Sequence, residues 1–285
     1  MSTESAKADN PLIKEMAMAG GCTRLFTRLI GPLLVLLLLG GFTRSYGDPA
    51  RAAQPGDIGL TITFLTRDGA VAAHEPLLAR IELVNNAEET VNIALLSCLE
   101  LCDSDGKVVA AIPRPKVTMD FMYGARSLKP GEKYTRTWVI SALYQFDKPG
   151  TYTLHVHWLY LPGGKLMDLV AGTADIRALP FDEARVTARC EELYQPMYSH
   201  QKSDIDLGIR ARALYSVRHD LALPYLDWMA REWGDANACY AMRQIGTPQA
   251  KALLDALAKR QDDAGKAARA AMTRTHTISM SDVGE

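Results

Sequence analysis

The sequence carries no large excess of charge of either sign. Its 32 Lys and Arg residues nearly balance 33 Asp and Glu residues, so the formal net charge is −1 over 285 residues. Downstream of the N-terminus the two signs are interspersed, as on an ordinary solvated surface. Nucleic-acid binding normally needs a basic patch or a strongly basic domain. The composition therefore argues against a nucleic-acid partner.

Motifs that carry catalytic chemistry are also missing. The chain has no G-x-S-x-G nucleophile motif, no P-loop and no dinucleotide fingerprint. Asp103, Asp105 and Gly106 lack the further acidic residues of a calcium loop and predict a hairpin turn instead. The sequence therefore predicts a protein that is not an enzyme and that needs no cofactor.

His155 and His157 are the best remaining candidates for a metal site. Alternate residues of a strand share a face, so both imidazoles are expected on the same side of a sheet. A protein zinc site uses three or four side-chain ligands, and a third ligand is missing nearby. Two histidines on a half-exposed sheet face are the favoured interpretation. A metal-dependent enzyme built on this pair is the least favoured function.

An apolar run long enough to cross a membrane is absent as well. Leu29–Phe42 is uncharged but has only 14 residues, whereas a span needs about 20. Arg24 and Arg28 precede the run, and small residues follow it as far as Gly47. These are the parts of a secretory signal peptide, so residues 1–47 are expected to direct export to the periplasm or the exterior. The open alternative is an uncleaved anchor, which would provide the only membrane contact.

Cysteines are few, and the one at position 22 precedes the apolar run. Cys98 and Cys102 would lie about 13 Å apart in an extended strand, which is too far for a disulfide unless a bulge or turn lies between them. Cys190 and Cys239 fall on predicted helices that are candidates for neighbours. Export makes a Cys190–Cys239 disulfide feasible. A pair of buried free thiols is the equally open alternative.

Residues 57–178 contain a series of β-type runs separated by turn signals. No helical pattern interrupts them, which predicts an antiparallel β-sandwich. The main runs are Ile58–Phe64, Leu77–Val84, Val91–Leu96, Lys107–Ile112, Tyr134–Ile140, Thr151–Tyr160 and Lys165–Ile176.

The segment LKPGEKYTRTWVISALYQFDKPGTYTLHVHW, residues 128–158, resembles the late strands of immunoglobulin-like bacterial domains. In those domains an L-x-P-G-E turn precedes one strand, and P-G-T-Y opens another. The resemblance implies that Tyr152 is a tyrosine-corner residue whose hydroxyl ties its strand to the adjacent connection. Small bacterial proteinase-inhibitor sandwiches look similar. An inhibitor with Ile112–Tyr123 as its exposed loop is therefore the second functional candidate.

Helical spacing replaces the strand pattern over residues 182–274. Asp182 predicts the N-cap of one helix, and Asp204 predicts the N-cap of the next. Similar stretches begin at Ala213 and at Ala241, 28 residues later, and a degenerate third begins at Ala271. Each stretch predicts a helix, a short turn and a second helix. The tail, residues 275–285, is expected to be disordered.

These stretches resemble the short HEAT-like repeats related to phycobilisome-lyase repeats, with the signature AL-x-x-(I/V)-G-D-P-x-A-x-x-x-L. In the first copy, Arg218-His219-Asp220 replaces the Gly-Asp-Pro turn. The resemblance implies a short capped helical stack whose second helices line a concave binding surface. The residues expected there are Tyr225, Asp227, Arg231, Lys251, Asp255 and Lys259.

The sequence thus predicts a two-domain α+β protein, an antiparallel Ig-like β-sandwich followed by a short HEAT-like α-helical repeat stack. Such an architecture offers surfaces for recognition and does not require a catalytic pocket. The favoured function is an exported, non-catalytic protein-interaction or scaffold module with a protein partner.

Overall fold

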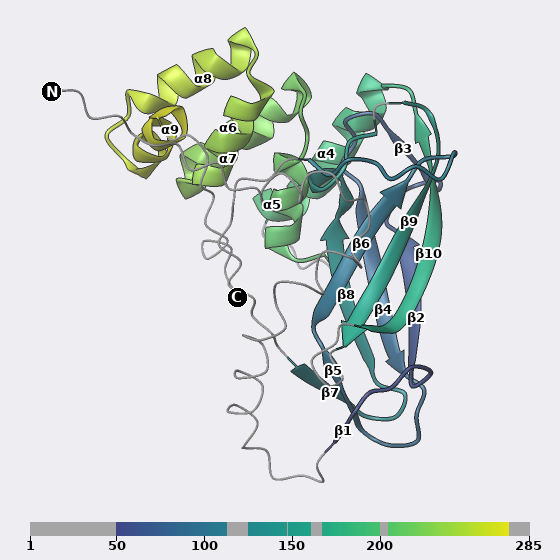
Figure 1. The fold of residues 1–285 in the computed structure, drawn as a ribbon. Helices are drawn as coiled ribbons and strands as arrows, with labels where there is room; N and C mark the ends of the chain where they lie inside the picture. The colour runs from purple at the N-terminus through teal and green to yellow at the C-terminus, as the bar shows by residue number, and fades with distance from the viewer. Residues whose placement is uncertain (1–49, 113–124, 147, 161–166, 200–204, 274–285) are drawn as a thin grey trace, which may run out of the picture.

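A computed structural model of the chain shows an α+β fold (Figure 1). The described residues are 50–112, 125–146, 148–160, 167–199 and 205–273. The predicted export segment, most of the expected inhibitor loop, the expected cap Asp204 and the C-terminal tail lie outside these ranges. Within them, no helix has the length and apolarity needed to cross a membrane.

The strands of the described residues form three open sheets, ordered β1-β5-β7, β3-β10-β9-β6 and β2-β4-β8. Their bounds are β1 Arg51–Ala52, β2 Ile58–Phe64, β3 Ala70–Ala72, β4 Leu78–Asn85, β5 Val91–Ala94, β6 Leu96–Cys102, β7 Ala125–Leu128, β8 Lys133–Val139, β9 Gly150–Tyr160 and β10 Met167–Leu179.

Strand pairing is antiparallel except at two short edge strands. β1 runs parallel to β5, and β3 runs parallel to β10. The expectation of purely antiparallel pairing is wrong at these two edges, because strands of two or three residues are too short for a pattern to mark them. The predicted strand Lys107–Ile112 is only partly formed. Residues 107–109 return along the end of β6 through the bridge between Cys102 and Val108 and the hydrogen bond from the Val109 N–H to the Leu101 carbonyl, but the pairing does not extend to Ile112.

One apolar core lies between the sheets β2-β4-β8 and β3-β10-β9-β6. Trp158 is fully buried there, and its indole N–H donates to the Ala94 carbonyl at 2.6 Å. β10 crosses β2 closely at Gly172, where an added Cβ would lie 2.7 Å from Leu60 Cδ2. Glycine permits this approach because it has no side chain.

The hydrogen bond predicted for the Tyr152 hydroxyl is present in the structure. The Tyr152 hydroxyl donates to the Lys148 carbonyl at 2.9 Å, so it ties β9 to the connection just before it. The Phe146 ring packs edge-on against Tyr152 at 5.2 Å between centroids. The predicted contact of this hydroxyl with the adjacent connection is confirmed.

The C-terminal part of the described chain is helical. Its elements are α4 Glu183–Tyr198, α5 Leu207–Tyr215, the 3-10 turn η3 Asp220–Ala222, α6 Leu223–Trp233, α7 Ala236–Ile245, α8 Pro248–Ala258 and α9 Asp263–Thr273. Asp182 caps α4 by accepting from the Arg185 N–H, as predicted. Asp206, not Asp204, caps α5 by accepting from the Gly208 N–H. Both acids are good N-caps, and only the position of the first helical turn distinguishes them.

The 28-residue offset seen in the sequence recurs in the structure. Ala213 and Ala241 are both buried, and each lies on the first helix of a helix–turn–helix pair. His219 caps the 3-10 turn η3 that leads into α6, and Thr247, 28 residues later, caps α8. The two turns touch, since the Thr247 hydroxyl donates to Asp220 Oδ1 at 2.6 Å. Ala213 and Ala241, and likewise His219 and Thr247, therefore hold similar positions in these two helix pairs.

The helices join the sheets through a packed seam. Leu78 of β4 and Val139 of β8 belong to the same apolar cluster as the helices. Figure 1 shows α4 and α5 against the sheets, with α8 and α9 farther away. Arg185 of α4 reaches across the seam. It donates through Nε to Glu75 at 2.6 Å and through Nη2 to Asp68 at 2.7 Å. Glu75 is only 3% exposed, so the seam contains a buried ion pair.

The C-terminal half of α4 is shaped by Pro196, which lies inside the helix. Proline has no N–H, so the Glu192 carbonyl lacks its normal helical donor. Arg210 of α5 is only 6% exposed and donates through Nη1 to the carbonyls of Glu192, at 3.1 Å, and Leu193, at 3.3 Å. The buried guanidinium therefore replaces the missing donor and fixes α5 against α4.

Candidate functional site

Aromatic side chains of α4 and α6 meet on the surface of the helical part. They are defined here as the aromatic cluster and comprise Tyr194, Tyr198, Tyr225, Trp228 and Trp233. Positions 194 and 198 are four residues apart, so both rings lie on one side of α4. Packing α4 beside α6 brings that side against the aromatic side of α6.

The ring of Tyr194 is the centre of the aromatic cluster. Its centroid lies 5.1 Å from those of Tyr225 and Trp228 and 5.7 Å from that of Tyr198. Trp228 continues the row to Trp233 at 5.0 Å. These separations are typical of attractive edge-to-face and tilted ring pairs. The cluster is half-buried in its middle and open at its ends, where Tyr198 is 57% and Trp233 is 39% exposed.

Carboxylates flank the aromatic cluster. Glu191 accepts a hydrogen bond from the Tyr225 hydroxyl at 3.0 Å. Burial and this hydrogen bond raise the pKa of Tyr225 above its ordinary value. Burial also raises the pKa of Tyr194. The neighbouring Tyr198, Glu191 and Glu232 raise it further.

The six residues predicted to share a binding surface lie on α6, on α8 and, for Lys259, at the C-cap of α8. Tyr225 belongs to the aromatic cluster, and Asp227 pairs with Arg231 at 2.7 Å. Lys251, Asp255 and Lys259 are all exposed. Within the part of the chain that the structure describes, these three make no hydrogen bond or ion pair with α6. Their joint role in binding stays a prediction.

The sequence alone does not distinguish Tyr194 and Tyr198 as site residues. Their spacing of four residues on an amphipathic helix was the available signal, but it does not show which other helix they face. The contact of Tyr194 with Trp228 joins residues 34 positions apart in the chain, and only the packing of α4 on the rest of the helices determines it.

His155 and His157 lie on the outer face of β9, both partly exposed. His157 Nδ1 is 3.1 Å from Asp168 Oδ2 of β10, and His155 lies opposite Glu100 of β6. No group of three His, Cys, Asp or Glu residues arranged to hold a metal ion occurs among the described residues. The pair is thus part of a polar sheet face.

Cys190 and Cys239 are free, fully buried thiols, so the candidate disulfide between them is not formed. Cys190 lies on α4, which packs on α5 and η3, whereas Cys239 lies on α7, which packs on α5, α6, α8 and α9. Burial raises the pKa of each thiol to about 12. Cys102 is also a free thiol, so it forms no bond with Cys98.

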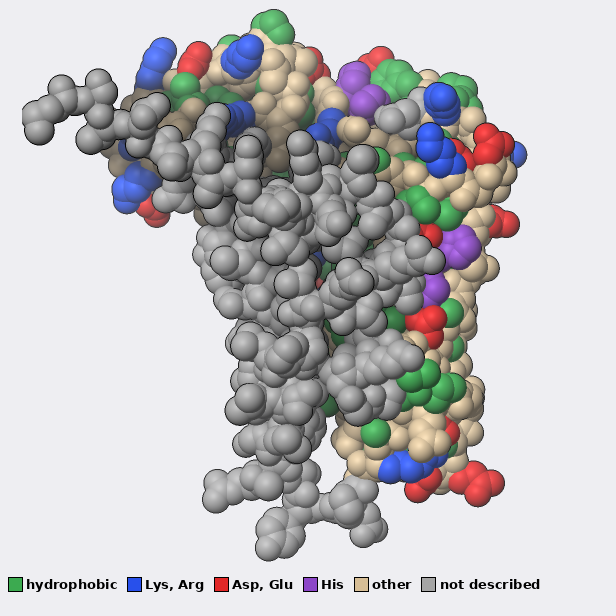
Figure 2. All heavy atoms as spheres, in the orientation of Figure 1, with side chains coloured by type: hydrophobic (Ala, Val, Ile, Leu, Met, Phe, Trp, Pro, Cys, Tyr) green, Lys and Arg blue, Asp and Glu red, His purple; other side chains and the backbone are tan. Residues whose placement is uncertain are grey.

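On the face drawn in Figure 2, acidic and basic side chains are interspersed, as the balanced composition leads one to expect.

No protein-family model matches the chain, and no curated protein matches it. Among solved structures, a structural-genomics target protein aligns with 44% of this chain and 90% of its own, at 13% identity and a TM-score of 0.28. The putative ApaA protein from Bordetella pertussis aligns with 44% of this chain and 91% of its own, at 12% identity and a TM-score of 0.26.

The alkylpurine DNA glycosylase AlkC from Pseudomonas fluorescens aligns with 43% of this chain at 15% identity and a TM-score of 0.25. This chain spans only 30% of the glycosylase. At such scores and identities these similarities assign neither a fold family nor an activity.

Proposed function

We propose that the protein is an exported, non-catalytic interaction module that binds a basic segment of a partner protein on the aromatic cluster. The N-terminal apolar run with its basic flank supports export. In this proposal the sheets are an Ig-like β-sandwich that carries a short HEAT-like helical stack as the binding part. The strand runs, the Tyr152 contact and the 28-residue equivalence of the helix pairs support that description.

The observation that carries the proposal is the aromatic cluster, exposed at its ends Tyr198 and Trp233, with carboxylates beside it. Aromatic faces attract Lys and Arg side chains, by about 0.5–1 kcal/mol at exposed sites and about 2 kcal/mol when water is excluded. Tyr and Trp are also the residue types that dominate binding energy at interfaces. Glu191 and Glu232 add attraction for the same cations. A basic segment therefore satisfies both features, whereas an acidic one would be repelled.

Tryptophan fluorescence of the purified protein tests the proposal, because Trp228 and Trp233 belong to the cluster. The titrants are a Lys/Arg-rich peptide and matched acidic and neutral peptides. Saturable binding of the basic peptide alone is expected. Tyr198→Ala and Trp233→Ala should each weaken it by about threefold to thirtyfold, the loss of one cation–π contact.

Met167→Ala is the matched control, since Met167 is 43% exposed but lies on β10, away from the cluster. Glu232→Gln should weaken binding and make it less sensitive to salt, because it removes an exposed charge without removing a ring. Equal binding of all three peptides, or unchanged affinity in both aromatic variants, would contradict the proposal.

A further inference from the structure

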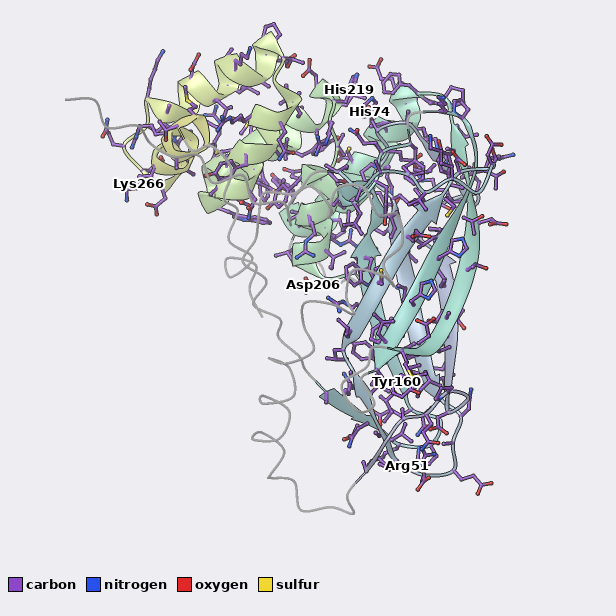
Figure 3. All side chains as sticks on the ribbon, viewed as in Figure 1. Arg51, His74, Tyr160, Asp206, His219 and Lys266 are labelled. Carbon is purple, nitrogen blue, oxygen red and sulfur yellow. The ribbon has the colours of Figure 1, made fainter. Side chains whose placement is uncertain are left out.

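A cavity of about 160 Å³ lies in the seam between the sheets and the helices. Its lining includes His74 and Glu75 from the β3–β4 connection, Ser141 and Phe146 beyond β8, and Ser216 and Arg218 beyond α5. Figure 3 shows His74 beside His219 at the junction of the two parts. The cavity therefore has walls from both parts of the protein.

Both serine hydroxyls that line the cavity already donate a hydrogen bond, one to the other serine and one to the backbone. Ser216 donates to the Ala213 carbonyl at 2.6 Å, so the 2.7 Å bond between Ser141 and Ser216 carries the proton of Ser141. Ser141 also accepts from the Leu77 N–H. These hydroxyls hold the walls together and have no proton left to donate to a ligand.

The carboxylate in the lining is already compensated. Glu75 Oε2 accepts from Arg185 Nε at 2.6 Å and from the Ala72 N–H at 2.7 Å. Arg218 differs, because its guanidinium makes no hydrogen bond or ion pair with any residue the structure describes. Among the described lining residues, it is the one permanent charge without a partner. A guanidinium has five N–H donors arranged to hold two oxygens of a planar anion.

A metal ion fits this cavity less well than an anion does. His74 lines the cavity, and the neighbouring His219, which is not part of the lining, has its ring centroid 5.6 Å from that of His74. His219 Nδ1 accepts from the Leu221 N–H at 3.3 Å, so the neutral ring carries its proton on Nε2. That nitrogen is then a donor and has no lone pair for a metal. His74 has φ +66°, the one positive φ at a non-glycine among the described residues. Such strained backbone is common at ligand sites.

We propose that this cavity binds a small monocarboxylate, with Arg218 holding the carboxylate and the rings of Phe146 and Tyr144 contacting its apolar body. The volume is close to that of a cavity that holds benzene, which limits the ligand to about six to ten non-hydrogen atoms. A single uncompensated cation matches a monoanion better than a doubly charged phosphate. Because the ligand touches both walls, its binding stabilises the seam.

Calorimetric titration and thermal unfolding of the full-length protein test the proposal, with benzoate as the probe. Benzamide is the matched neutral compound, and inorganic phosphate and N-acetylphenylalanine are comparison anions. We expect benzoate to bind saturably and to raise Tm, and benzamide to do neither. Phosphate should bind more weakly because of its charge, and N-acetylphenylalanine because of its size.

Arg218→Gln should weaken benzoate binding at least about tenfold, since it removes a charged hydrogen-bond donor. Arg218→Lys should retain part of the affinity. Arg177→Gln is the control, because Arg177 is exposed on β10 and does not line the cavity. Equal binding of benzamide, an unchanged affinity in folded Arg218→Gln, or tighter binding of either comparison anion would overturn the proposal. The comparison of benzoate with benzamide needs no variant, so it decides the question even if Arg218 variants fail to fold.

Discussion

Replacing Arg210 with methionine should destabilise the protein mainly through α4, not through α5 where the residue itself lies. Arg210→Met removes the donor to the Glu192 carbonyl, which has no helical donor because residue 196 is proline. It also removes the bonds to the carbonyls of Leu193 and Ile205, at 3.3 and 3.1 Å.

The magnitude follows from what each carbonyl loses. Leaving a buried acceptor unpaired costs about 1–3 kcal/mol, and the part-buried Glu192 carbonyl should lie in the lower part of this range, to which the loss of the other two bonds adds. We expect Arg210→Met to lower the free energy of unfolding by about 2–4 kcal/mol. In a Pro196→Ala background, the introduced alanine supplies the N–H that the Glu192 carbonyl lacks. The same Arg210→Met change should then cost about 1–2 kcal/mol less.

Urea unfolding followed by far-UV circular dichroism measures the four proteins of this double-mutant cycle. Contacts of Arg210 that do not depend on residue 196 cancel in the cycle, so the coupling energy isolates the Glu192 carbonyl. An equal cost of Arg210→Met in both backgrounds would refute the view that this guanidinium replaces a helical donor.

Three further outcomes follow from the structure. Gly265→Ala should lower Tm by several degrees, because an added Cβ would overlap the backbone oxygen of residue 260, which cannot move aside. Cys190 and Cys239 should resist alkylation at pH 8 in the native protein and react fully in denaturant, since both are buried and have pKa values of about 12. The hydrogen bond from Arg185 lowers the pKa of Asp68 to about 2. The stabilisation from this pair should persist above about pH 4, disappear as the pH falls towards 2, and be absent in Asp68→Asn when unfolding is followed against pH.

Sequence patterns identified the elements with long, regular alternation. Ile58–Phe64 is both the predicted run and the observed β2, because alternating burial leaves little freedom in register. β7 and the two short parallel strands were missed, since two to four residues carry too little periodicity. The N-cap at Asp182 was predictable because a capping side chain acts within three residues.

The contacts that form the candidate sites depend on tertiary packing and could not be predicted in this way. Each aromatic residue is visible in the sequence, but the meeting of Tyr194 with Trp228 requires α4 to lie beside α6. The cavity at Arg218 likewise needs two distant segments, one before β4 and one after α5. Local patterns describe single elements, and they carry no information about which elements are neighbours.

Arg185 lies on the helix that links the sheets to the aromatic cluster. The first turns of α4 contact the sheets, and its last turns carry residues of the aromatic cluster. Arg185→Gln would leave Glu75, which is 3% exposed, as a buried charge without its partner. Breaking a buried ion pair from one side costs about 3–5 kcal/mol. The loss should be much smaller in a Glu75→Gln background, where no charge is left unpaired. Denaturant unfolding of the four proteins would show this difference. Equal losses in both backgrounds would mean that the seam is held by its apolar contacts around Leu78 and Val139 and not by the ion pair.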